Sequence, residues 1–372
     1  MRPQGLARLI RDEWFFGASV ATCLIFMIQE PLLMGSLANP VWLVVIFLWL
    51  FGTVLGSALS VVRHADHLAV RLGEPYGTLI LTLSVTSIEV MSISAVMMHG
   101  RDDPTLVRAT LFSVVMIILN GMVGLSLLVG GWRHREQHYN LQGANTYLGL
   151  IIPLAVLSLI MPDFTQTTAG PTLSKAQETF LILMSVGLYV AFLMVQVGRH
   201  RGYFTIGGED ADPHIGAPPT GRGVLSHHAV LLALYMLPVV FLAEQLAHPV
   251  DYLIETLNAP IGFSGMIMAL LVATPEAVGA VRAAGRNHLQ RAVNIFLGSV
   301  LSTIGLTVPA MLIISRLTGR GFVLGLEHTD FVMLLLTLAV SVVTFASGRT
   351  NVLQGAVHLL LFAAYLLLIF QG

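Results

Sequence analysis

Two glutamates, Glu89 and Glu276, fall deep inside long apolar stretches of this 372-residue chain. An ionisable side chain at membrane depth is costly, so by default it indicates a functional site. Burial favours the protonated form of a carboxyl group, and two neighbouring carboxylates repel each other. Such a pair can hold protons, or release them and bind a cation. The sequence therefore predicts that Glu89 and Glu276 bind protons and metal cations in turn, with no catalytic residue.

Further oxygen atoms at helical spacing are candidates to complete a coordination shell. Thr82 and Thr86 precede Glu89 on or beside one face of the same expected helix. Pro275 has no amide N–H and therefore frees a main-chain carbonyl near Leu271, which is able to ligate a hard cation. The following helices add five hydroxyl or amide side chains: Ser113, Asn120, Asn294, Ser299 and Ser302.

Each of these residues also has a purely structural interpretation. A deep glutamate can stay protonated and hydrogen-bond another helix, and hydroxyl groups in spans are more often packing contacts than ligands. The pairs His64/His67 and His134/His138 have spacings that can hold a metal. We expect them in cytoplasmic loops without further ligands, as interfacial histidines. The single cysteine and the lack of deep histidines argue against zinc or copper, and oxygen ligands suit Ca²⁺, Na⁺ or K⁺.

The composition indicates where these side chains are placed. Hydrophobic residues make up 55% of the chain and charged residues only 10%, whereas soluble domains carry about a quarter charged residues. The net charge of −1 and the scattered basic residues give no footprint for nucleic acid. We therefore expect an all-α polytopic membrane protein whose partners are the lipid bilayer, inorganic cations and protons. No cofactor is expected, and the oligomeric state is left open.

Apolar runs broken by polar residues, glycine or proline predict eleven transmembrane helices. Most of the 19 Lys and Arg residues lie at the N-terminus and in every second loop after it. By the positive-inside rule this bias predicts an inner-membrane protein with a cytoplasmic N-terminus and a periplasmic C-terminus. The predicted spans are 14–34, 40–62, 76–98, 106–130, 144–161, 176–198, 225–247, 260–282, 290–315, 329–346 and 351–370.

A polar stretch containing Glu209, Asp210 and Asp212 divides the last ten spans into two sets of five. Five is odd, so the two halves would be inverted repeats with the substrate site at the midplane between them. The two halves share a sequence pattern. A proline opens the second helix of each half, and a glutamate follows deep in that helix. The next helix begins Leu-x-Arg-Ala in both. The predicted organisation is an extra helix (1–39), a first repeat (40–198), a short acidic cytoplasmic linker (199–224) and a second repeat (225–372).

At these residues the chain resembles a known family. The motifs are Gly73-Glu74-Pro75-Tyr76-Gly77 running into Glu89, Pro275-Glu276, the segment 294–301 and the segment 347–353. Together they resemble the ChaA-type bacterial calcium/proton antiporters of the cation/calcium exchanger superfamily. The resemblance implies a ten-helix inverted-repeat core with an extra first helix. It also implies that Glu89 and Glu276 are the essential acids and that the helices 40–62 and 225–247 slide to alternate access.

The function predicted from the sequence is export of cytoplasmic Ca²⁺, with Na⁺ or K⁺ as further substrates, in exchange for H⁺. One departure from the wider family bears on the cation: Val85-Thr86 and Val272-Ala273 stand where calcium/proton exchangers have Gly-Asn. Fewer amide oxygens weaken calcium selectivity. The alternatives are a monovalent Na⁺ or K⁺/H⁺ antiporter and a passive cation channel. No His-Glu-x-x-His motif or paired aspartates occur in the spans, so we expect a transporter and no enzyme.

Overall fold

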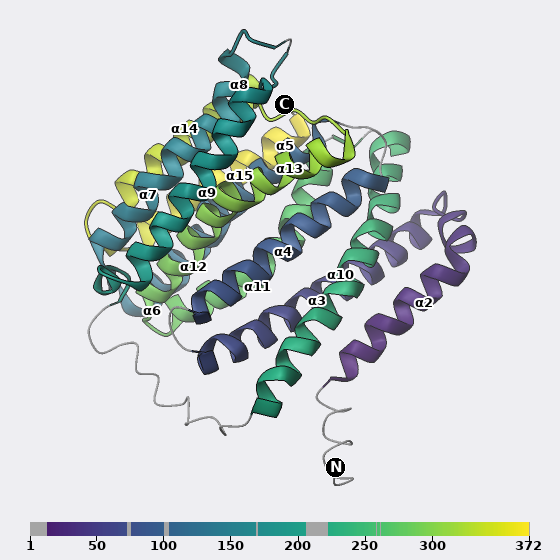
Figure 1. Cartoon of the computed structure of the whole chain (residues 1–372), viewed down its shortest axis with the longest axis horizontal. Coiled ribbons are helices and arrows are strands. Elements are labelled where there is room, and N and C mark those ends of the chain that lie inside the picture. The colour runs from purple at the N-terminus through teal and green to yellow at the C-terminus, as the bar shows by residue number, and fades with distance from the viewer. Residues whose placement is uncertain are drawn as a thin grey trace. The chain divides into compact units, whose positions relative to one another are not determined.

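The computed structural model describes residues 13–72, 76–99, 104–168, 170–205, 222–257, 259–260 and 262–371. These residues are almost entirely helical (Figure 1). They divide into two compact units, and each is described by itself. Unit 1 comprises Met1–Arg101 and Pro219–Asn258, and unit 2 comprises Asp102–Pro218 and Ala259–Gly372.

Unit 1 is built around two long helices that pack against each other, α3 (Pro40–Leu72) and α10 (Arg222–Leu257). The helix α4 (Tyr76–His99) packs against both of them, and so does α2 (Trp14–Met34). These four helices position Glu89, which lies on α4. They also bring together the two helices that the family resemblance implies are mobile, α3 and α10.

Unit 2 contains three helices that include a short π-helical segment, and these segments are η1, η2 and η4. A π-turn widens the helix by one residue and is often found at functional sites. A two-stranded antiparallel pairing joins β1 to β2. The elements in chain order are α5 (Leu106–Met116), η1 (Ile117–Met122), α6 (Val123–His134), β1 (Gln137–His138), α7 (Leu141–Ala155), η2 (Val156–Ile160), α8 (Met161–Phe164), α9 (Lys175–Val197), η3 (Arg201–Phe204), α11 (Gly262–Gly285), α12 (Leu289–Ser302), η4 (Thr303–Thr307), α13 (Val308–Thr318), α14 (His328–Thr344), β2 (Arg349–Thr350) and α15 (Val352–Gln371).

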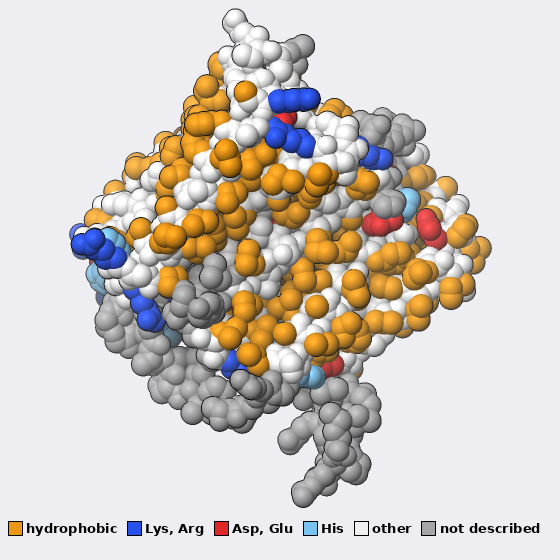
Figure 2. Space-filling model, viewed as in Figure 1, with side chains coloured by type: hydrophobic (Ala, Val, Ile, Leu, Met, Phe, Trp, Pro, Cys, Tyr) orange, Lys and Arg blue, Asp and Glu red, His pale blue; other side chains and the backbone are white. Residues whose placement is uncertain are grey.

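The all-α membrane fold is confirmed. Within the described residues, ten helices are long and apolar enough to cross a membrane, and the apolar helix α14 is slightly shorter. Each of the eleven predicted spans coincides with one of these. Figure 2 shows the surface that such a protein needs, because hydrophobic side chains cover much of the face in view and the charged ones gather toward its edges.

The predicted ends of several helices were wrong. The helix α3 continues to Leu72, ten residues past its predicted end, and α10 runs from Arg222 to Leu257 instead of 225–247. His64 and His67 therefore lie within α3 and not in a loop, which corrects the prediction. His134 ends α6 and His138 lies in β1. Hydropathy indicates which residues lie in the membrane, whereas a helix can continue beyond it, and α10 does so even with Pro238 and Pro249 inside it.

Glycine allows the site-bearing helix α11 to approach α5 closely. A Cβ atom on Gly265 would lie 2.5 Å from the carbonyl carbon of Ala109 and 2.8 Å from the amide nitrogen of Thr110. Small residues permit such contacts between membrane helices, where van der Waals packing drives association. The contact holds α11 against α5 within unit 2.

Part of the predicted organisation lies outside the described residues. This applies to Glu74 and Pro75 of the opening motif and to Glu209, Asp210 and Asp212 of the acidic linker. The compact units follow packing and not the division into two five-helix repeats, so the domain limits 1–39, 40–198, 199–224 and 225–372 stay a prediction.

Candidate cation and proton site

Glu276 and two predicted serines come together in unit 2. Glu276 is half-buried on α11, and its Oε2 atom accepts a hydrogen bond from the Ser299 hydroxyl of α12. Ser302 is buried one turn further along α12 and donates from its Oγ to the main-chain oxygen of Ser299 at 2.9 Å. A hydroxyl that donates to a carboxylate stabilises its ionised form, and its oxygen is also a ligand for hard cations.

The helix α11 continues through Pro275, directly before Glu276. Leu271 lies four residues before this proline, and both residues are buried. Because proline has no N–H, the usual bond to the Leu271 carbonyl cannot form. The assignment of this carbonyl oxygen as a cation ligand stays a prediction.

Glu89 lies in unit 1, where only 2% of its surface is exposed. Thr86 and Ser92 are one turn before and after it on α4, and both are also buried. Within the described residues, neither Thr86 Oγ1 nor Ser92 Oγ has a hydrogen-bond partner. Buried hydroxyl groups usually have one, so these two are available to a ligand. Thr82, one turn further from Glu89, is partly exposed.

Ser113 and Asn120 are buried but bond to other helices of unit 2. The Asn120 amide, in η1, donates to Thr337 Oγ1 of α14 at 2.8 Å and lies 3.5 Å from Met116 Sδ. Its Oδ1 atom is buried without a hydrogen-bond partner in the part of the chain that the structure describes. Ser113 Oγ accepts a bond of 2.7 Å from the Tyr365 hydroxyl of α15. These bonds tie α5 and η1 to α14 and α15.

Asn294 is engaged at both ends of its amide. Its Nδ2 donates to the main-chain oxygen of Phe204 in η3 at 2.8 Å, and its Oδ1 accepts from Gln290 at 2.9 Å. The side chain therefore fastens α12 to η3. Its assignment as a cation ligand stays a prediction, and these two bonds weigh against it.

The sequence analysis missed a polar stripe on α14. Thr337, Ser341 and Thr344 are all buried, at a spacing of four and three residues that places them on one helix face. Thr344 Oγ1 lies 2.9 Å from Nε2 of His358, which is fully buried on α15. This periodicity in an otherwise apolar helix was the signal that could have revealed the partners of Asn120 and His358.

No group of three or more His, Cys, Asp or Glu side chains that could hold a metal ion occurs among the described residues. Each glutamate is accompanied instead by hydroxyl oxygens, which is the ligand type expected for a weakly held hard cation. Glu89 belongs to unit 1 and Glu276 to unit 2, and their pairing stays a prediction.

A helical membrane fold with carboxyl groups among hydroxyl side chains inside it is typical of one class of protein, the ion-coupled secondary transporters. Comparison with known families agrees with this assignment. The family described as sodium/calcium exchanger protein matches residues 42–198 and 227–371. The chain belongs to this family, and the resemblance to the cation/calcium exchanger superfamily is confirmed.

Individual relatives share most of the chain. The sodium-potassium/proton antiporter ChaA of Escherichia coli is 42% identical, over 90% of this chain and 91% of its own length. The calcium/proton antiporter ChaA of Bacillus subtilis is 23% identical, over 85% of this chain and 88% of its own length. The solved structure of native YfkE matches the fold with a TM-score of 0.75 and 21% identity, covering 96% of this chain and 100% of that one.

These comparisons establish the general function. The chain is a multi-pass membrane cation/proton antiporter of the exchanger family, and its relatives are transporters. They leave the transported cation and the roles of the two glutamates to be argued from the residues themselves.

Proposed function

We propose that this antiporter exchanges the monovalent cations Na⁺ and K⁺ for protons, and that Glu276 and Glu89 carry the exchange. The contact between Glu276 and Ser299 is the observation on which the proposal rests. A carboxyl group that loses its proton there gains a hydrogen bond and has a hydroxyl oxygen beside it. It can thus alternate between a protonated form and a cation-bound form, which is what exchange requires.

The residues next to both glutamates favour a monovalent cation over calcium. Ca²⁺ takes about six to eight oxygen ligands. The positions three and four residues before Glu276 hold Ala273 and Val272, and Val85 precedes Glu89 by four; all three side chains are apolar and buried. Thr86 supplies the one hydroxyl among these four positions. The lack of amide oxygens at these positions weakens the site for Ca²⁺.

The relatives support the same order of substrates. The one named as a sodium-potassium/proton antiporter is 42% identical to this chain, and the one from Bacillus subtilis named as a calcium/proton antiporter is 23% identical. From the sequence alone, Ca²⁺ is predicted to be the main transported cation. Calcium remains the second candidate, supported by the family description and by that second relative.

For Glu89 we propose the same alternation, with Thr86 and Ser92 as neutral ligands. Their hydroxyl groups are buried within one helical turn of the carboxyl group. We place the protein in a bacterial inner membrane with its N-terminus in the cytoplasm and its C-terminus in the periplasm, as the distribution of Lys and Arg indicates. The helices α3 and α10 would then move to alternate access.

The test uses everted membrane vesicles from a host that lacks its own antiporters. The vesicles are energised, a pH-sensitive dye is followed, and Na⁺, K⁺ or Ca²⁺ is added in turn. We expect dye recovery with Na⁺ and K⁺ at lower concentrations than with Ca²⁺. Flux should saturate and respond to cation on the opposite side, as exchange does and conduction through a channel does not.

Glu276→Gln and Glu89→Gln should each abolish dye recovery while the protein still inserts and purifies as the wild type does. Glu30→Gln is the control, because its side chain is 44% exposed near the end of α2, and it should retain activity. Substantial exchange in either site variant would remove that glutamate from the mechanism. Recovery with Ca²⁺ alone would reverse the proposed order of cations.

A further inference from the structure

Four histidines from two helices of unit 1 form a cluster that the proposed exchange does not use. His64 and His67 lie on α3, and His227 and His228 lie on α10. Nδ1 of His64 is 3.0 Å from Nδ1 of His228. The ring of His67 stacks on His228 with centroids 4.8 Å apart, and His227 meets the same ring edge-on at 5.5 Å. We call these four residues the histidine cluster.

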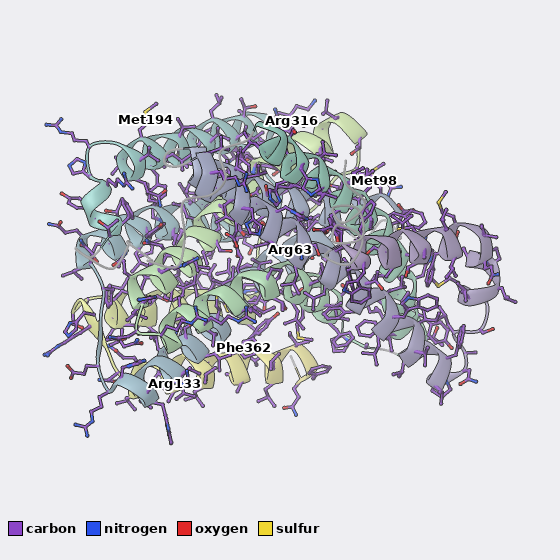
Figure 3. The ribbon with its side chains drawn as sticks, turned by 90° about the horizontal axis from the view of Figure 1, so that it is seen from below. Arg63, Met98, Arg133, Met194, Arg316 and Phe362 are labelled. Carbon is purple, nitrogen blue, oxygen red and sulfur yellow. The ribbon has the colours of Figure 1, made fainter. Side chains whose placement is uncertain are left out.

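A single carboxylate, Glu13, joins the cluster to α2. Its Oε2 atom accepts hydrogen bonds from Arg63 at 2.8 Å and from the Tyr235 hydroxyl at 2.9 Å, and it lies 3.4 Å from Nε2 of His64. The His64 side chain is only 2% exposed and that of Glu13 14%, while Arg63, labelled in Figure 3, is 45% exposed. Three helices thus converge on one buried imidazole.

The contact between the two Nδ1 atoms depends on their protonation. A hydrogen bond between two imidazole nitrogens needs one donor and one acceptor, so the pair shares a single proton. When both rings are protonated, both Nδ1 atoms are donors and two positive charges lie face to face. The contact in the structure is therefore that of a pair with at least one neutral ring.

The charges around the pair determine how it responds to acid. Burial opposes a proton on His64; Glu13, directly before α2, favours one, and Arg63 and His67 of α3 oppose it. Burial also opposes a proton on His228, as do His67, His64 and Arg71 of α3 and His227 of α10. Asp66 is the other acidic side chain in this turn of α3. On α4, which packs against both helices, Glu89 is a further titratable side chain. Glu13, whose Oε2 atom lies 3.4 Å from Nε2 of His64, balances one positive charge on the pair.

We propose that the contact between His64 and His228 is a proton-operated latch between α3 and α10. With one shared proton the two helices are joined and move together. Uptake of a second proton breaks the contact and stops exchange. The latch rests on the proposed exchange by these helices and adds a control that is separate from the glutamates. It lies on the side of the membrane predicted to be cytoplasmic, so acidification of the cytoplasm would halt proton entry.

The test separates the latch from competition at the glutamates. Protons that compete with the cation raise KM, and saturating cation overcomes them, whereas a broken latch lowers the maximal rate. In everted vesicles the cytoplasmic face is outside, so the outer pH is varied at saturating Na⁺. Free histidine has a pKa of about 6.5, and the paired rings resist a second proton, so we expect the wild-type maximal rate to hold from pH 8 to about pH 6.5 and to fall only below that, about twofold by pH 5.5.

Three variants test the assignment. His228→Gln keeps a neutral hydrogen-bonding group and should retain its maximal rate at pH 5.5, whereas His228→Lys carries a fixed charge and should be slow even at pH 8. His248→Gln is the control, because this histidine is also on α10 and pairs with Glu30 of α2 at 3.7 Å, outside the cluster. It should follow the wild-type pH profile. A fall at low pH that persists in His228→Gln, or disappears in His248→Gln, would overturn the latch.

A second measurement does not need transport. The paired histidines resist a second proton in the folded protein, so the unfolded chain binds more protons near pH 6 and the folded state loses stability as the pH falls. The melting temperature of purified wild type in detergent should drop further between pH 8 and pH 5.5 than that of His228→Gln. Equal drops would refute the latch. The latch would also be refuted if His228→Gln lost exchange at pH 8 while its melting temperature at that pH equalled that of the wild type. Absence of exchange in the wild type would refute the proposed function instead.

Discussion

Replacing Ser299 by alanine removes the donor that Glu276 has on α12, and we expect the KM for the transported cation to rise about tenfold. The Ser299 hydroxyl donates to a carboxylate oxygen, and a hydrogen bond to a charged group contributes about 1.5–3 kcal/mol, a factor of about 10 to 150 in binding. Hydrogen bonds between membrane helices average only about 0.6 kcal/mol, a factor of about three. Because Glu276 is half-buried, its bond should fall between these limits.

The sign follows from which form of Glu276 the hydroxyl stabilises. Loss of the donor disfavours the ionised carboxylate, which is the form that binds the cation. Protons then compete more strongly, so the increase in KM should be larger at pH 7 than at pH 9. The maximal rate should change by less than about twofold, because saturating cation restores occupancy.

The assay measures the rate of dye recovery against Na⁺ concentration at several pH values in everted vesicles. Ser302→Ala is the matched control, because Ser302 is buried on the same helix but bonds a main-chain oxygen of that helix at 2.9 Å. It should keep the wild-type KM. A wild-type KM in Ser299→Ala at every pH, or the same increase in both variants, would refute the reasoning.

Three further predictions concern the framework of unit 2. Gly265→Ala should lower the melting temperature by an amount equivalent to about 1–3 kcal/mol, because the added Cβ would lie 2.5 Å from the Ala109 main chain; Gly262→Ala, with its nearest atoms at 3.7 Å, should not. A double-mutant cycle of Asn120→Ala and Thr337→Val should give a coupling of about 0.6 kcal/mol for their 2.8 Å bond, and a coupling of zero would contradict the contact. Burial raises the pKa of Tyr139, whose hydroxyl accepts from the Gly348 N–H at 3.1 Å; its stabilisation is complete below about pH 10 and is lost at higher pH. Melting in detergent between pH 9 and pH 11 should therefore fall less in Tyr139→Phe than in the wild type.

Hydropathy predicted the existence of every long helix but not where the longest ones end. Residues 63–72 of α3 include three charged side chains and two histidines, yet the chain stays helical through Leu72. They lack glycine and proline, and the next glycine is Gly73. The same reason explains why the contact between His64 and His228 was missed: His64 was assigned to a loop after the span 40–62, whereas His228 lay inside the predicted span 225–247.

The direction in which each polar side chain points could not be predicted from spacing. Ser113 and Asn120 are seven residues apart, and this periodicity places them on one helix face. Periodicity does not reveal which neighbouring helix that face meets, and the face is further displaced by η1, which contains Asn120. The bonds to Tyr365 and Thr337 follow from tertiary packing. Ser299 was predicted as a neighbour of Glu276 on weaker grounds, and the structure places it there.

The π-helical segments give the repeat hypothesis a new structural argument. The segment η1 lies in the helix that begins Leu106-Val107-Arg108-Ala109, and η4 lies in the helix that begins Leu289-Gln290-Arg291-Ala292. These are the third helices of the two predicted halves, whereas η2 lies in the fourth helix of the first half and α14, the fourth of the second, has no such segment. The two arginines differ: Arg108 is buried and bonds Gly325 and Glu327, whereas Arg291 is exposed. The halves would therefore share a backbone design while differing in their side chains.

The same contrast applies to the two glutamates. Glu89 has a hydroxyl on its own helix, because Thr86 lies three residues earlier, where side chains are adjacent on a helix surface. Ala273 occupies that position before Glu276, and the hydroxyl comes instead from Ser299 on the neighbouring helix. The two glutamates therefore differ in what the neighbouring hydroxyl tests: Ser299→Ala removes a contact between α11 and α12, whereas Thr86→Ala changes α4 alone.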